Sequence, residues 1–103
     1  MAKYKHVLYS KICSVIVTDA NRDYDGSITL CPNLMLMAGL RHFDMVHVNC
    51  RNSGQHWETY VIPGEKDECC LNGAAANHFN IGDDVHILCY CLTDDNFYIP
   101  KII

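Results

Sequence analysis

Residues 11–30 indicate the fold more clearly than any other part of the chain. They read Lys11-Ile12-Cys13-Ser14-Val15-Ile16-Val17-Thr18, then Asp19-Ala20-Asn21-Arg22-Asp23, then Tyr24-Asp25-Gly26-Ser27-Ile28-Thr29-Leu30. Residues 11–18 are rich in β-branched side chains, which favour a pleated strand. Residues 19–23 are polar turn formers that end this strand. Residues 28–30 alternate apolar, polar, apolar, which predicts a second, half-buried strand.

Short strands separated by turns are expected along the rest of the chain. The pattern predicts strands at 45–49, 57–62, 69–71 and 85–91, and turns at 52–54, 63–64 and 81–83. A helix is expected to begin at Pro32 and stop near Gly39, with an apolar face of Leu34, Met35, Met37, Ala38 and Leu40. Strands with one or two short helices, and no alternation of strand and helix, predict a mainly β fold, a small barrel. The tail, 93–103, has no clear pattern.

Length and composition restrict the kind of protein. At 103 residues the chain is expected to form a single domain, 1–103. The net charge is −4 and the eight basic residues are scattered, so no nucleic-acid or membrane-surface partner is expected. No apolar run approaches the roughly 20 residues that span a bilayer. The first residues lead into a strand-like segment without a signal-peptide pattern, which predicts a cytoplasmic protein.

Cysteine and histidine are frequent, with seven and six copies. An odd number of cysteines without a secretory context is typical of reduced thiols. Cys69 and Cys70 would point to opposite faces of a strand, whereas Cys89 and Cys91 would share one face. Neither pair has C-x-x-C spacing, and the histidines form no helix-borne H-E-x-x-H pair. The sequence therefore predicts no metal site.

The common catalytic loops are missing from the sequence. It contains no G-x-G-x-x-G, no G-x-x-x-x-G-K and no G-x-S-x-G elbow. What remains is Tyr24-Asp25-Gly26-Ser27, which by itself is only a polar turn. Its surroundings give it more weight.

Six blocks in a fixed order carry a family resemblance. They are Tyr9-Ser10-Lys11-Ile12, Val17-Thr18-Asp19-Ala20-Asn21, the run from Tyr24 to Leu30, Thr59-Tyr60-Val61-Ile62, Asn72-Gly73-Ala74-Ala75-Ala76, and Ile81-Gly82-Asp83 with Val85. Over residues 7–92 this pattern resembles the aspartate 1-decarboxylase family. The resemblance implies a double-ψ β-barrel that assembles as a homotetramer, with active sites between neighbouring subunits.

The resemblance also implies that the chain cuts itself into residues 1–26 and 27–103. In the family the serine, here Ser27, attacks the preceding carbonyl in an N→O acyl shift, and β-elimination and hydrolysis then leave a pyruvoyl group. Gly26 is expected to allow a strained backbone that a Cβ would forbid. Ser27 supplies a nucleophile that is weak unless it is positioned. Thr59 is the hydroxyl that would stabilise the oxyanion.

The pyruvoyl group derived from Ser27 would be the cofactor. It would form a Schiff base with the amine of the substrate, a small amino acid, and act as an electron sink. By resemblance Tyr60 supplies the proton, Asn72 hydrogen-bonds near the cofactor, and the Gly73-Ala74-Ala75 backbone lines the pocket. The alternative interpretation of these residues is a buried strand followed by a turn of small residues.

The substrate pocket matches the family less well. Lys11 matches a lysine that holds a substrate carboxylate, but His56 stands where the family has an arginine, and a histidine cannot make a two-pronged contact. Three further departures fall at expected pocket positions: Cys13, Asn49 and His86.

The expected function is decarboxylation of L-aspartate to β-alanine and CO2, which feeds pantothenate synthesis. Arg51 would then compensate for the missing guanidinium. One alternative is the same chemistry on a different amino acid. Another is an uncleaved, non-catalytic barrel that serves as a binding or assembly subunit, although Thr59 and Tyr60 argue against it. Cleavage is either spontaneous or assisted by a maturation factor.

Overall fold

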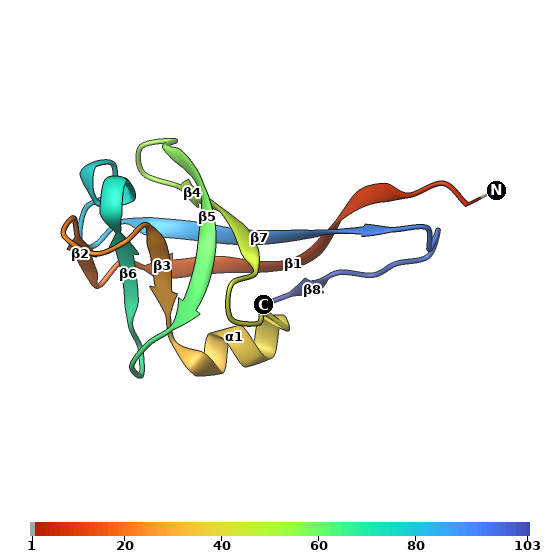
Figure 1. Ribbon diagram of the computed structural model, residues 1–103, viewed down its shortest axis with the longest axis horizontal. Helices are drawn as coiled ribbons and strands as arrows, with labels where there is room; N and C mark the ends of the chain where they lie inside the picture. The colour runs from red at the N-terminus through yellow and green to blue at the C-terminus, as the bar shows by residue number, and fades with distance from the viewer. Residues whose placement is uncertain (1) are drawn as a thin grey trace.

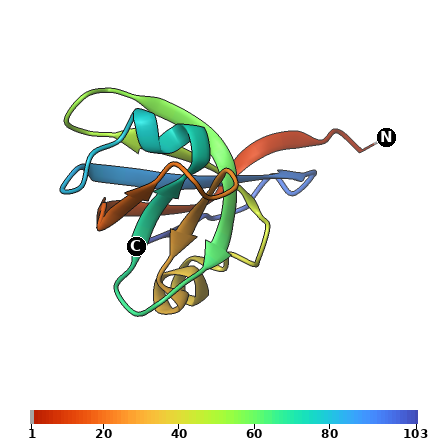
Figure 2. The same cartoon turned by 60° about the vertical axis from the view of Figure 1, so that its left-hand side comes forward.

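The computed structural model describes residues 2–103 as eight strands, one α-helix and one 3-10 helix. The strands are β1 (Lys5–Ile16), β2 (Asp19–Asn21), β3 (Ser27–Leu30), β4 (Met45–Cys50), β5 (His56–Pro63), β6 (Cys69–Asn72), β7 (Asp84–Thr93) and β8 (Lys101–Ile102). The helices are α1 (Pro32–Ala38) and the 3-10 helix η1 (Gly73–Asn77). They lie at opposite ends of the folded body (Figures 1 and 2). No helix within residues 2–103 is long and apolar enough to cross a membrane.

The sheet curls until its ends meet. Its strand order is β2-β6-β3-β5-β4-β7-β1-β8, so β1 and β2 stand near opposite ends of the order although only Val17 and Thr18 separate them in the chain. The Val17 amide donates to the Asp83 carbonyl at 2.9 Å, and the Thr18 amide donates to the Cys69 carbonyl at 2.8 Å. These two residues therefore join the ends of the sheet. The prediction of a mainly β fold, a small barrel, is confirmed.

The core lies inside this curled sheet. Along β4, and along β7 as far as Cys89, every second side chain is buried, as expected for strands with one face against a core. Ile28 and Leu30 of β3 are fully buried, and Thr29 between them is half-buried, which confirms the predicted alternation. The fully buried apolar side chains include Ile28, Leu30, Val46, Val48, Val61, Leu71 and Val85.

The helix α1 begins and ends as predicted. Pro32 occupies its first turn, and Gly39 ends it with a left-handed φ of 69°. The predicted apolar face is correct at Met35 and Ala38 but wrong at Met37, which is 57% exposed. Two helical steps turn a side chain by about 200°, so Met37 lies on the side opposite Met35.

Long-range pairing extended the strands beyond their sequence signal. The prediction of a turn over residues 19–23 was wrong at Asp19–Asn21, which form β2 because they pair in parallel with β6. β1 begins at Lys5, well before the predicted residue 11, because its first half pairs with β7 as far as Thr93. The tail, which had no clear pattern, supplies β8, and β8 pairs in parallel with β1. Outside the barrel this pairing forms an arm, residues 4–8 and 90–102 (Figure 1), and the molecule measures 46 × 24 × 24 Å.

Candidate active site

Ser27 lies buried between two strands. In the antiparallel pair β3 and β6 it stands opposite Asn72, and the two residues are 1% and 3% exposed. The Asn72 side-chain amide donates to Ser27 Oγ at 2.8 Å and to Thr29 Oγ1 at 2.9 Å. The Ser27 hydroxyl in turn donates to the Asp25 carbonyl at 3.4 Å. Both amide hydrogens of Asn72 therefore serve to hold hydroxyl groups.

Cys70 completes this hydrogen-bonded group. Its thiol donates to Asn72 Oδ1, with 3.2 Å between sulfur and oxygen. Burial raises the pKa of the Cys70 thiol, so it keeps its proton and remains a donor. With its oxygen bound to the thiol, the Asn72 amide must turn its nitrogen toward Ser27. This role of Cys70 was not predicted from the sequence, although residues two apart in a strand share one face, so the spacing of Cys70 and Asn72 carried the signal.

The backbone of Gly73 packs against the Gly26–Ser27 junction. A Cβ added to Gly73 would lie 2.7 Å from Gly26 Cα and 2.8 Å from Gly26 N, and Gly73 has a left-handed φ of 70°. Gly26 itself has no such φ, and a Cβ added there would meet nothing within 4 Å. The expectation of strain at Gly26 was therefore wrong. The residue that must be glycine here is Gly73, because its backbone lies too close to the Gly26 backbone to leave room for a Cβ.

Tyr60 shares a face with Ser27. Ile28 and Val61 are partners in the parallel pair β3 and β5, and Ser27 and Tyr60 each precede one of them. In a parallel pair of strands, the two residues that come just before paired residues point to the same face of the sheet. Tyr60 also lines a hollow of about 320 Å³, whose other walls are Tyr24, Asp25, His42, Phe43, Ile62 and Pro63. The chain that leads to Gly26 thus borders the hollow that Tyr60 faces.

Thr59 points to the other face. It pairs with Val46, which is fully buried in the core, so the half-buried Thr59 side chain is turned toward the barrel interior. The hydrogen-bonded group of Ser27, Thr29 and Asn72 does not include it.

The alanines after Gly73 differ in exposure. Ala74 is exposed, whereas Ala75 is 1% exposed and belongs to the core. Of the three residues expected to line the pocket, Gly73 is therefore the one placed against the junction.

Lys11 and His56 lie on a separate part of the sheet. The strands β7, β4 and β5 stand between β1, which carries Lys11, and β3. His56 precedes Tyr60 by four residues in β5, which is about 13 Å along a strand. Within one chain, the structure does not bring these two predicted substrate contacts to Ser27.

Two side chains near His56 bear on the missing arginine. Arg51 Nη1 forms an ion pair with Asp84 Oδ2 at 3.2 Å, so its guanidinium already has a partner. His86 stands opposite Asn49, and its Nδ1 is buried without a hydrogen-bond partner within residues 2–103. Three of the four departures from the family pattern, His56, Asn49 and His86, thus lie together on one face of the sheet.

A small β-barrel that buries a serine beside an asparagine, at a Gly-Ser junction, is the arrangement that the family resemblance implies. The family model described as aspartate decarboxylase matches residues 3–103. A protein of Caldicellulosiruptor bescii named aspartate 1-decarboxylase is 47% identical over 98 residues, covering 92% of this chain and 77% of the relative.

Two further relatives carry the same name. The one from Campylobacter fetus is 51% identical over 85 residues, covering 82% of this chain and 74% of its own. The one from Campylobacter hominis is 45% identical over 100 residues, covering 94% and 88%. The chain belongs to the aspartate decarboxylase family. The predicted resemblance, and with it the expectation of an enzyme of the decarboxylase class, is confirmed.

Proposed function

We propose that this protein decarboxylates L-aspartate to β-alanine and CO2, after cutting its own chain between Gly26 and Ser27. The single observation that carries the proposal is the buried Ser27, which Asn72 holds at the junction where Gly73 packs against Gly26. The names of the relatives support aspartate as the substrate.

In the cutting step, Ser27 Oγ would attack the Gly26 carbonyl carbon and release the peptide nitrogen, which leaves an ester. The Asn72 amide, 2.8 Å from Oγ, restricts the hydroxyl to one side of the junction. β-Elimination would then free the carboxylate of Gly26, and hydrolysis would convert the remaining dehydroalanine to a pyruvoyl group with loss of ammonia. The fragments are residues 1–26 and 27–103.

Each remaining residue has one role in the proposal. By the family resemblance the Thr59 hydroxyl would stabilise the oxyanion formed at the Gly26 carbonyl, although in this structure its side chain is turned toward the barrel interior, away from the Ser27 group. The pyruvoyl group derived from Ser27 supplies an electron sink for decarboxylation. The Tyr60 hydroxyl would donate the proton that replaces CO2, and the hollow beside it would hold the substrate. Asn72, Gly73, Ala74 and Ala75 would shape the cofactor side of the pocket.

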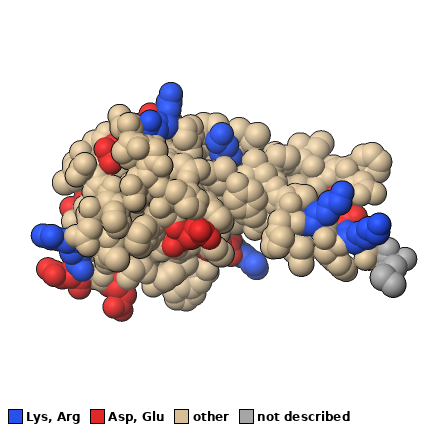
Figure 3. Space-filling model, turned by 90° about the horizontal axis from the view of Figure 1, so that it is seen from above, with Lys and Arg blue, Asp and Glu red and all other residues tan. Residues whose placement is uncertain are grey.

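Lys11 and His56 would bind the substrate carboxylates from a neighbouring subunit of a homotetramer. Their separation from Ser27 within one chain supports an active site shared between subunits. The arm supports assembly, because it exposes large apolar side chains: Tyr4, Tyr90, Leu92, Phe97, Ile99 and Ile102. Charged residues stand in small separate groups on the face shown in Figure 3, and uncharged atoms cover most of it. The proposed partners are a small amino acid and further copies of the chain.

We also propose that the protein works in the cytoplasm. All seven cysteines are free in the structure, including five that are buried. Free buried thiols are typical of a reducing compartment.

Intact mass spectrometry of the purified, incubated protein tests this function. We expect two fragments that meet at the 26/27 junction, the larger with a blocked, ketone-reactive terminus. Ser27→Ala should remain one chain, whereas Ser53→Ala, which changes a serine in the exposed turn before β5, should be cut like the wild type. A single full-length mass for the wild type, even after incubation with a lysate that could supply a maturation factor, would favour an uncut binding or assembly subunit.

A different amino-acid substrate is the second candidate. The observation that favours it is His56 at the position where the family has an arginine. Release of CO2 from a panel of amino acids by the cut protein would separate the two. Turnover of another amino acid at a higher kcat/KM than aspartate would replace the proposed substrate.

A further inference from the structure

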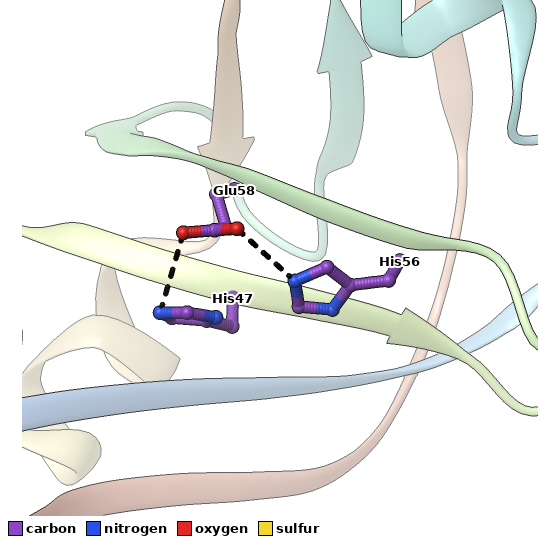
Figure 4. Close-up of side chains that lie close together, drawn as sticks. All are labelled: His47, His56 and Glu58. Carbon is purple, nitrogen blue, oxygen red and sulfur yellow. Dashed lines mark ion pairs between the residues drawn. The ribbon is translucent and has the colours of Figure 1, made fainter.

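Three potential metal ligands meet on the outer face of the sheet. Figure 4 shows the side chains of His47, His56 and Glu58 turned toward one another. His47 Nε2 lies 3.9 Å from Glu58 Oε1, and His56 Nε2 lies 3.5 Å from Glu58 Oε2. All three donor atoms fall within 4.8 Å of one another. They come from two adjacent strands, β4 and β5.

The strand register brings them together. His47 stands directly opposite Glu58 in the antiparallel pair, so their side chains are neighbours on one face. His56 precedes Glu58 by two residues in β5, which places it on the same face and diagonal to His47. The backbone pairing therefore makes the three side chains neighbours on one face of the sheet.

A neighbouring side chain prepares His56 as a ligand. Its Nδ1 forms a hydrogen bond with Asn49 Oδ1, with 2.5 Å between the two atoms. Because Oδ1 only accepts, Nδ1 carries the hydrogen, and Nε2, which faces Glu58, offers its lone pair in the neutral ring. Metal-binding histidines typically have such a partner on the second nitrogen, which fixes the tautomer and the ring orientation.

The spacing and surroundings suit a small divalent ion. Ligands of a tetrahedral zinc ion stand about 3.3 Å apart. The side chains are 27% (His47), 47% (His56) and 52% (Glu58) exposed, so they can close the remaining gap. Beside His47 a hollow of about 410 Å³, lined also by His6, Met45 and Tyr90, gives room for a further ligand.

We propose that His47, His56 and Glu58 bind one divalent transition-metal ion of the zinc type, with its remaining position open. Two histidines and one carboxylate are a ligand set that zinc takes in sites with an exchangeable fourth ligand. The open position accepts a carboxylate oxygen. This last step rests on the proposed function: His56 would bind the substrate carboxylate through the ion, which supplies the positive charge that the family's arginine provides.

Zinc binding by the full-length protein tests the site. Zn²⁺ is titrated against a chromophoric chelator, and Co²⁺ spectra report the ligand type. The wild type and the uncut Ser27→Ala variant should each bind one ion per chain with equal affinity. His56→Gln and Glu58→Gln should weaken binding by about 100-fold or more, and Asn49→Ala by about 10-fold. The control His78→Gln, which changes an exposed histidine whose ring lies tilted against Trp57, should bind within two-fold of the wild type.

Three results would overturn the site. They are no ion bound at micromolar Zn²⁺, equal binding in His56→Gln and the wild type, and Co²⁺ spectra with thiolate bands, which would assign the ion to cysteines. Because Ser27→Ala cannot form the cofactor, its Zn²⁺ affinity tests the site separately from the decarboxylase. In the active wild type, Zn²⁺ should lower the KM for aspartate about tenfold with little change in kcat. If Zn²⁺ leaves the KM for aspartate unchanged, the proposed contact between the ion and the substrate carboxylate is wrong, while the metal site itself stands.

Discussion

Two regions of this molecule are both built on a pair of antiparallel strands, but one buries its polar side chains and the other leaves them exposed. Around Ser27, the β3–β6 pair buries its polar side chains almost completely and satisfies them with one another. On the outer face of β4 and β5, His56 and Glu58 stay about half exposed. Buried hydrogen bonds are costly to break, whereas exposed ion pairs contribute between about 0 and 1 kcal/mol. Changes in the first region should therefore affect the fold and the chemistry, and changes in the second should affect affinity.

The largest expected effect is at Tyr60, which lines a hollow together with Tyr24 and Asp25. Tyr60→Phe removes the proposed proton donor and should lower kcat for decarboxylation by about 10²–10⁴-fold. Self-cleavage should persist, because the Ser27 hydrogen bonds do not involve Tyr60. Rates of CO2 release and intact masses measure the two separately. Tyr4→Phe, on the exposed arm, is the control, and a Tyr60→Phe enzyme with wild-type kcat would remove Tyr60 from the mechanism.

Gly73→Ala should disrupt the packing at the junction. Both Gly73 and Gly54 have a left-handed φ, 70° and 77°, and alanine there costs about 1–2 kcal/mol. Only at Gly73 would the new Cβ meet the backbone of Gly26, whereas at Gly54 it meets nothing within 4 Å. Urea unfolding should show Gly73→Ala less stable than Gly54→Ala by about 1–3 kcal/mol, with slower cleavage. Equal stabilities of Gly73→Ala and Gly54→Ala would show that the backbone around Gly26 shifts easily to make room for the new Cβ.

Cys70 offers a finer test of the buried group. Cys70→Val leaves Asn72 Oδ1 without its donor and should cost about 1–3 kcal/mol of unfolding free energy. It should also slow cleavage, because the contact that keeps the oxygen of the Asn72 amide away from Ser27 is then lost. Cys70→Ser keeps a donor at the same place and should restore the cleavage rate. If Cys70→Ser cuts itself as slowly as Cys70→Val, the hydrogen bond from residue 70 to Asn72 Oδ1 does not position Asn72.

On the exposed face, a substitution should change affinity and leave the fold intact. His56→Arg restores a two-pronged carboxylate contact and should lower the KM for aspartate by about tenfold, measured with a chelator present. The unfolding midpoint should stay near that of the wild type, since His56 is exposed. A variant that loses activity on every amino acid tested would contradict aspartate as the substrate.

The smallest effect concerns thiol chemistry. Burial raises the pKa of Cys69 to about 12 and that of Cys89 to about 11, so both stay protonated at pH 8. Alkylation followed by mass mapping should modify the half-buried Cys13 and Cys91 first. Because these two pKa values lie above the ordinary value of 9.0, their contribution to stability is complete below pH 9. It should be lost as the pH rises toward 11–12. Early modification of Cys69 would show local opening of β6.

Much of the fold could be read from local pattern. The β-branched run before Asp19, the alternation around Thr29, and Pro32 with Gly39 each reported the element that formed there, because burial and backbone preference act over a few residues. The family blocks also identified Ser27 and Asn72. Nothing local could show that β1 begins at Lys5 or that residues 101–102 form β8, since both depend on pairing with distant strands.

The contacts around the site needed the tertiary structure. That Asn72 binds Ser27, that Cys70 orients Asn72, and that Gly73 rather than Gly26 adopts the special conformation all follow from how β3 meets β6. In the same way, the grouping of His47 with His56 and Glu58 arises only when β4 pairs with β5. Sequence specifies which residue types and strand preferences are available, through short-range physical chemistry. Register between strands selects which side chains touch, and register is settled by the whole buried core at once.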